Sequence, residues 1–229
     1  MTKFPEIIVF DVDGVLVNVH GSFHKTVLET VKFFTGKKVT DRQLHTWKNK
    51  PGFNDDWKLS TAWVKSLGGK QEYDEIKAKF VELYWGKNGD GYVKREKWLL
   101  DRAELRRLSR RCEIGIFTGR VWQEMNYTLD HCKTREFFTS IVTADDVKKG
   151  KPDPEGLLKV LKGRPKESAI YVGDNVDDAL AAKSAGVPFV GILRPRSDER
   201  RERIDTLRDL GALTILGNVN DLEGWLKRR

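Results

Sequence analysis

The segment IIVFDVDGVL, residues 7–16, decides the fold. Four apolar residues run directly into two acids and a glycine, which is typical of a buried strand that ends in a charged turn. Side chains two residues apart in a strand point to the same side, so Asp11 and Asp13 can face one site beyond the end of the strand. Gly14 allows the chain to turn sharply there. The pair predicts a divalent-cation site or an acid–base function, while a solvated turn after an edge strand remains an alternative for so short a motif.

Length and composition indicate a globular protein. A chain of 229 residues, 39% hydrophobic and 33% charged, is long enough for one large core with a smaller inserted unit. No apolar run approaches the roughly 20 residues of a membrane span, and the first residues lack the pattern of a secretory signal. Cys112 and Cys132 form neither a metal-ligand pair nor a disulfide framework. We therefore expect a cytoplasmic protein with reduced cysteines that does not contact a membrane.

The net charge of +8, from 42 Lys and Arg against 34 Asp and Glu, has two interpretations. It could reflect nucleic-acid binding or attraction of small anionic substrates. Between residues 194 and 208, six Arg are interleaved with four acids, which favours a solvated surface. We expect a small anionic substrate and no nucleic-acid partner. The sequence leaves open whether the protein is a monomer or a homodimer.

Residues 17–97 form a block with helical periodicity. Apolar residues at helical spacing predict four amphipathic helices. The first has Ser22 as a plausible N-cap and ends at Gly36, the second begins at Thr40 or Asp41, the third covers residues 55–67 and the fourth residues 73–84. Four such helices form a small bundle that buries its own apolar stripes.

From Trp98 onwards, short apolar strands alternate with helices. The expected strands after the first cover residues 113–117, 140–143, 169–172, 187–192 and 212–216. Such alternation predicts an α/β fold, a doubly wound parallel Rossmann-like sheet. The predicted domains are a core of residues 1–16 and 98–229 and an inserted helical bundle of residues 17–97.

Polar residues of distinct chemistry follow three of these strands. Thr118 follows the second and Asp174 the fourth, and Lys151 lies on a loop between them. Ligands of an open parallel sheet gather at the carboxyl ends of its strands. A carboxylate nucleophile, a hydroxyl, a fixed cation and a further acid suit phosphoryl transfer. Taken singly, Thr118 could cap a strand, Lys151 could be a solvated loop residue and Asp174 could cap a helix.

In this order the residues resemble the motifs of the haloacid dehalogenase superfamily. The four segments are DVDGV at 11–15, FTGR at 117–120, KGKPDP at 149–154 and VGDNVDD at 172–178. The helical block lies where members of subfamily I carry a helical cap. With this block between the first and second motifs, the resemblance extends over nearly the whole chain, and four motifs in the right order are far more specific than any one of them.

The resemblance implies a role for each matched residue. Asp11 would be the nucleophile that forms an aspartyl-phosphate, and Asp13 would act as acid and then base. Thr118 and the amide of Gly119 would hold the phosphoryl oxygens, and Lys151 would neutralise them. The metal residues would be Asp11, the backbone oxygen of Asp13, and Asp174, with Asp178 supporting a metal-bound water and Mg²⁺ as the cofactor. Asn18 stands where many members have an acid, so this chain lacks that acid.

Substrate choice would belong to the helical cap. Its 16 basic and 10 acidic residues between Val17 and Lys97 give it a net charge of +6, which suits an anion. We expect Arg42, Lys50 or Asn54 to reach the substrate; the alternative is a connecting turn capped by Asn54. The GFNDDW segment at 52–57 resembles a branch similar to phosphoglycolate and histidinol-phosphate phosphatases. The four histidines show no ligand spacing and are expected to be surface or packing residues.

The sequence therefore predicts a Mg²⁺-dependent phosphatase of small phosphorylated metabolites. An acid at Asp13 favours phosphate esters over haloacids, because the dehalogenases of the superfamily lack an acid there. A phosphomutase or phosphotransferase of the same fold is one alternative. A non-catalytic module that binds anionic partners is another, and the intact set of catalytic residues counts against it.

Overall fold

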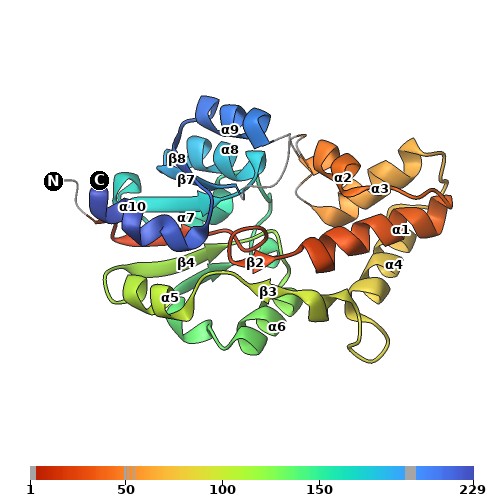
Figure 1. Cartoon of the computed structure of the whole chain (residues 1–229), viewed down its shortest axis with the longest axis horizontal. Helices are drawn as coiled ribbons and strands as arrows, with labels where there is room; N and C mark the ends of the chain where they lie inside the picture. Colours follow the sequence, from red (N-terminus) through yellow and green to blue (C-terminus); the bar gives the residue numbers. More distant parts are fainter. Residues whose placement is uncertain (1–3, 49, 51, 54, 194–199) are drawn as a thin grey trace. The chain divides into compact units, whose positions relative to one another are not determined.

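The computed structural model describes residues 4–48, 50, 52–53, 55–193 and 200–229. The chain divides into two compact units, one of residues 1–17 and 98–229 and one of residues 18–97 (Figure 1). It passes between them in two short paired strands, β2 (Val17–Asn18) and β3 (Lys97–Trp98). Among the described residues, no helix combines the length and apolarity that a membrane span requires.

The first unit is built on a six-stranded sheet of order β5-β4-β1-β6-β7-β8. Neighbouring strands pair in parallel throughout, so the predicted doubly wound α/β fold is confirmed. The strand order reverses at β1, which lies between β4 and β6, and this is where open sheets bind ligands. The strands are β1 (Ile7–Phe10), β4 (Glu113–Phe117), β5 (Ser140–Val142), β6 (Ala169–Gly173), β7 (Phe189–Ile192) and β8 (Ala212–Leu216).

Helices surround this sheet. They are α5 (Arg102–Ser109), α6 (Trp122–Cys132), α7 (Glu155–Leu161), α8 (Val176–Ala185), α9 (Arg200–Asp209) and α10 (Leu222–Arg228). On one face, Val9 and Tyr171 of the sheet pack in one buried cluster with apolar residues of α7, α8 and α9. α5 packs against β4, and its Arg107 donates to Glu223 of α10 at 3.1 Å. Short 3₁₀ turns lie at Arg135–Phe137, Ala144–Asp146, Lys166–Ser168 and Val219–Asp221.

The second unit consists of helices, as predicted. α1 (Lys25–Thr35), α3 (Asp56–Ser66) and α4 (Tyr73–Trp85) pack against one another, and α2 (Asp41–Lys48) adds the buried Leu44. Gly36 ends α1 in the left-handed conformation, as expected. The expected N-cap at Ser22 is wrong, because a π-helical turn, η1 (His20–His24), precedes α1 and buries Ser22. A 3₁₀ turn, η2 (Tyr92–Arg95), closes the unit.

Candidate active site

The side chains predicted to carry the chemistry lie at the carboxyl ends of the three central strands. The register pairs Phe10 of β1 with Ile116 of β4 and with Val172 of β6. The residues that follow these strands, Asp11, Thr118 and Asp174, therefore lie at the same edge of the sheet. Because these strands are parallel and adjacent, segments more than a hundred residues apart in the sequence meet there.

Two glycines allow the carboxylates to approach closely. Gly14 has a positive φ of 79°, and a Cβ there would lie 2.1 Å from Oδ2 of Asp174. At Gly173 a Cβ would lie 2.5 Å from Cβ of Asp178. Any larger residue would push these acids away from the strand ends, so both glycines are required by space, and Gly14 also by its left-handed conformation.

A buried lysine joins two of the acids. Lys151 Nζ lies 2.6 Å from Oδ1 of Asp11 and 2.7 Å from Oδ1 of Asp178. The Tyr171 hydroxyl donates to the same Asp178 oxygen at 2.7 Å. The exposed fraction of the side chain is 0% for Lys151, 6% for Asp11 and 0% for Asp178, so solvent screens these charges little. This network fixes the direction of the Asp11 carboxylate.

Burial and charge oppose one another in this network. Burial disfavours the charged form of Lys151, but Asp11 and Asp178 outweigh it and raise the pKa of the lysine. Burial raises the pKa of the Asp11 carboxyl well above its usual value; Lys151 opposes this, while Asp178, Asp13 and Asp174 add to it. The site thus holds more negative charge than its lysine compensates, which is the electrostatic environment that a bound cation relieves.

The acids also fit the geometry of a cation site. One carboxylate oxygen each from Asp11, Asp174 and Asp178 lies within 4.8 Å of the others. Oxygen donors of this kind suit a hard divalent cation. Asp178 already accepts from Lys151, Tyr171 and the backbone amides of Asp174 and Asn175, the amides at 3.2 and 3.1 Å. Because the oxygens of Asp178 are already occupied by these donors, we propose that Asp11 and Asp174 bind the metal ion directly and that Asp178 does not.

Thr118 and Asp13 are connected through Arg120. Thr118 is 1% exposed, and its hydroxyl accepts from the Arg120 amide at 3.2 Å. The Arg120 guanidinium donates two hydrogen bonds to Oδ1 of Asp13, at 2.9 and 2.7 Å, and another to the Thr128 hydroxyl at 2.5 Å. Arg120 is itself 1% exposed. A rigid, buried guanidinium therefore sets the position of Asp13.

Three residues of this site are not predicted by the sequence. Arg120 belongs to the FTGR segment, but the resemblance implies no role for it, and Tyr171 lies within the expected apolar strand at residues 169–172. Arg203 of α9 donates to the Asp174 backbone oxygen at 2.8 Å, and its side chain lies 4.0 Å from Oδ2 of Asp174. The signal for Tyr171 was its hydroxyl in an otherwise apolar strand two residues before Gly173, since a buried tyrosine hydroxyl needs a partner.

The residues predicted to contact the substrate belong to the segment of the helical unit. Arg42 is exposed on α2. Lys50 places Nζ 4.3 Å from the centre of the Trp47 ring. Asn54 lies outside the described residues, and the N-cap of α3 is Asp55, which accepts from the amides of Trp57 and Lys58. Contact of Arg42, Lys50 or Asn54 with substrate remains a prediction.

We expect Arg120→Leu to destabilise the first unit. Removing the guanidinium leaves the Asp13 carboxylate, one-third exposed, without its two charged hydrogen bonds. We expect the free energy of unfolding to fall by about 2 kcal/mol, because solvent screens this ion pair only in part. Urea denaturation measures it, and the Arg120→Leu, Asp13→Asn double variant should lose less than the sum of the two single variants. Additive losses would show that the pair contributes nothing.

Comparison with known proteins gives the family. Residues 8–192 match the family described as haloacid dehalogenase-like hydrolase. The chain is 28% identical over 224 residues to phosphoglycolate phosphatase 1 of Pseudomonas aeruginosa, covering 91% of this chain and 79% of that protein. It is 30% identical over 201 residues to an imidazoleglycerol-phosphate dehydratase of Phytophthora nicotianae, covering 84% of this chain. The match spans only 44% of that longer relative.

A solved structure shows the same fold. The crystal structure described as a predicted phosphoglycolate phosphatase from Haemophilus somnus aligns with a TM-score of 0.78 at 17% identity, covering 98% of this chain and 99% of that one. At this identity the likeness concerns the fold alone. The family match extends from the second residue of β1 to the end of β7 and includes Asp11, Thr118, Lys151 and Asp174. This chain is an enzyme of the haloacid dehalogenase-like hydrolase family.

Proposed function

We propose that the protein is a Mg²⁺-dependent phosphatase that hydrolyses a small phosphorylated metabolite through a phosphoaspartate at Asp11. The observation that carries the proposal is the buried contact of Asp11 with Lys151, beside Asp174 and Asp178. A carboxylate held at the end of a strand by a fixed ammonium group, with a cation site next to it, suits attack on phosphorus. Homologous phosphatases act on phosphorylated molecules, as the name of the Pseudomonas relative states.

In the first step, an oxygen of Asp11 attacks phosphorus and forms an acyl-phosphate. The bond from phosphorus to the leaving oxygen breaks, and Asp13 supplies the proton to that oxygen. Lys151 stabilises the phosphoryl oxygens as negative charge gathers on them, and Thr118 hydrogen-bonds to them. Arg120 holds Asp13 through its Oδ1.

In the second step, Asp13 takes a proton from water. The hydroxide attacks phosphorus, the bond to Asp11 breaks, and inorganic phosphate leaves with the Asp11 carboxylate restored. Mg²⁺ held by Asp11 and Asp174 would neutralise phosphoryl charge and orient the phosphate. Asp13 therefore gives one proton to the leaving oxygen in the first step and regains one proton from water in the second.

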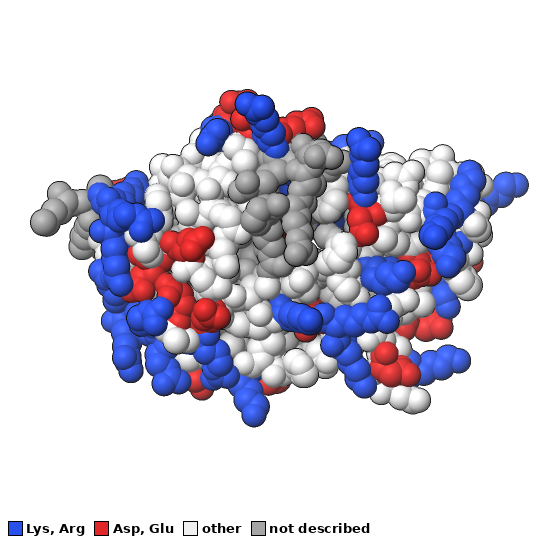
Figure 2. Space-filling model, viewed as in Figure 1, with Lys and Arg blue, Asp and Glu red and all other residues white. Residues whose placement is uncertain are grey.

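The mixed distribution of charge on the surface supports the proposal of a small substrate. On the face seen in Figure 2, Lys and Arg are interspersed with Asp and Glu. In one mixed group, Glu223 of α10 pairs with Lys227 of the same helix, with Arg107 of α5 and with Arg111, which follows α5. Nucleic acid is bound by a patch or stripe of one sign, and mixed pairs neutralise one another. We therefore propose attraction of small anions and no nucleic-acid partner.

A phosphate-release screen tests the proposed activity. Purified protein is incubated with a panel of phosphorylated metabolites that includes phosphoglycolate, with Mg²⁺ and with EDTA. We expect release of inorganic phosphate from at least one compound with Mg²⁺ and its loss with EDTA, because the excess negative charge around Asp11 then stays uncompensated. Release that is equally fast with EDTA contradicts metal dependence. Phosphate transfer only in the presence of an acceptor hydroxyl would favour a phosphotransferase.

A further inference from the structure

Three of the four histidines of the chain gather at one place in the helical unit. His20 and His24 lie at the two ends of η1, with ring centres 5.9 Å apart. His45 of α2 places its ring centre 5.5 Å from that of His24. The fourth, His131, lies in the other unit, on α6, where it stacks on Tyr127. The catalytic proposal uses none of these residues.

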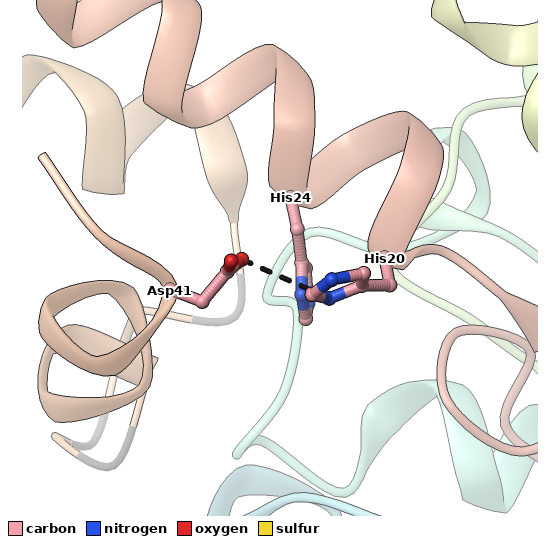
Figure 3. A group of neighbouring side chains, drawn as sticks. All are labelled: His20, His24 and Asp41. Atoms are coloured by element: carbon pink, nitrogen blue, oxygen red, sulfur yellow. Dashed lines mark ion pairs between the residues drawn. The ribbon is translucent and has the colours of Figure 1, made fainter.

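An acid completes the group. Asp41, the first residue of α2, places Oδ1 3.7 Å from Nδ1 of His20. One ligand atom each from His20, His24 and Asp41 lies within 4.8 Å of the others. Figure 3 shows the two imidazoles side by side, with the carboxylate directed at them from the start of the second helix. Tetrahedral Zn²⁺ with bonds of about 2.0 Å needs ligand atoms about 3.3 Å apart, so small side-chain rotations close the site.

The backbone explains why the histidines face one way. η1 is a π-helical turn, in which the amide of His24 donates to Val19 across five residues at 3.1 Å. Such turns are rare in proteins overall, and those that occur are often found at functional sites. The amide of His20 donates to the Asn18 side chain at 3.1 Å, which fixes the start of the turn. The His24 ring lies edge-on to both His20 and His45, at 73° and 84°.

The geometry points to a binding site for a divalent transition-metal ion of the Zn²⁺ type, with His20, His24 and Asp41 as its ligands. Two imidazoles and one carboxylate match the donors that Zn²⁺ prefers, whereas Mg²⁺ binds through oxygen. The side chains of His20 and Asp41 are 64% and 47% exposed, so a fourth position stays open to water. An open position is typical of metal sites whose ion exchanges or binds a further ligand.

The expectation that the histidines lack ligand spacing does not hold for His20 and His24, although metal binding by them is a proposal. His20 and His24 are four residues apart, which is the spacing of two metal-binding histidines on one helical face. Asp41 and His45 repeat that spacing on α2. A bound ion would connect η1 to α2 across residues 25–40 and so stabilise the helical unit.

The test is a titration of tag-free protein with Zn²⁺ in the presence of saturating Mg²⁺, followed by imidazole ¹⁵N NMR and by thermal unfolding. Asp11→Asn with Asp174→Asn serves as the background, so that the carboxylates of the sheet unit do not bind the added ion. We expect the resonances of His20 and His24 to shift on addition of one equivalent of Zn²⁺, while His131 stays unchanged. Mg²⁺ alone should move none of them.

Two variants make the result specific. Asp41→Asn preserves size, and His20→Gln changes an exposed ring; each should weaken Zn²⁺ binding at least about tenfold and remove the Zn²⁺-dependent rise in melting temperature. His131→Gln is the matched control and should bind as the background protein does. The proposal is overturned if Zn²⁺ leaves the His20 and His24 resonances in place, or if both cluster variants bind as tightly as His131→Gln. Because the background lacks Asp11, this outcome is independent of the phosphatase activity.

Discussion

We expect Asp11→Asn to lower the kcat of phosphate release by a factor of about 10⁴ or more, the scale on which enzymes lose activity when their nucleophile is removed. An amide oxygen is a poor nucleophile and carries no charge to bind a cation. The fold should survive the change, because burial raises the pKa of the Asp11 carboxyl and the neighbouring Asp178, Asp13 and Asp174 add to this, while Lys151 opposes it and keeps Asp178 as a partner. Removing its charge relieves that repulsion, so the melting temperature should not fall.

Steady-state kinetics and thermal unfolding measured together check this result. Asp130→Asn is a suitable control, because Asp130 is 68% exposed and pairs with Arg135 on the surface. It should turn over as the wild type does. An Asp11→Asn protein that is folded and retains a tenth of the wild-type rate contradicts the assignment of the nucleophile.

Lys151→Met should have the second large effect, and on both activity and stability. The substitution keeps most of the side-chain volume but leaves Asp11 and Asp178 buried without their cation. Removing one partner of a buried ion pair costs about 3 kcal/mol or more in the free energy of unfolding. Activity should also fall, because Lys151 fixes the direction of Asp11 and, in the proposed mechanism, would neutralise the phosphoryl oxygens.

A double variant separates the two effects. Lys151→Met with Asp178→Asn removes one of the two unpaired charges and keeps an acceptor for the Tyr171 hydroxyl. It should recover part of the lost stability in urea denaturation but none of the lost activity. Lys149→Met, a change of an exposed residue on the same loop, is the control and should alter neither. If the double variant is no more stable than Lys151→Met, charge repulsion is not the cause of the instability.

The sequence predicted the strand ends well because a parallel sheet imposes a simple rule. Buried strands are recognisable as short apolar runs, and the residue after each run must lie at the ligand-binding edge. Asp11, Thr118 and Asp174 follow from this rule alone. The inserted helices were equally readable, because each carries an apolar stripe at helical spacing.

The partners of these residues were harder to predict. The Asp13–Arg120 pair joins residues 107 apart, and the Asp11–Lys151 pair joins residues 140 apart. Which cation meets which acid depends on side-chain directions that periodicity does not specify. The sequence did not predict α9, because its segment is dense in arginine and acids. Its short apolar side, Ile204 and Leu207, cannot be distinguished from a solvated surface by the pattern alone.

The histidine cluster shows a different limit. The four-residue spacing within each pair is visible in the sequence. His20 and His24 become neighbours of Asp41 and His45, however, only when α2 packs beside η1. Four residues on two helices cannot be recognised as one group until that packing is known. Their close approach is therefore a result of tertiary structure, in contrast to the strand-end acids.

The position of the covalent phosphate distinguishes Asp11 from any other nucleophile. In Asp13→Asn the proposed hydrolysis step would lose its base, so an acyl-phosphate formed with an activated substrate such as p-nitrophenyl phosphate should accumulate. That substrate needs little help from an acid to release its leaving group. Acid quenching followed by peptide mass spectrometry should place the phosphate on Asp11, in the peptide that spans residues 4–25. Phosphate on any other residue, or turnover by the wild type with no phosphorylated peptide in this variant, would contradict the account.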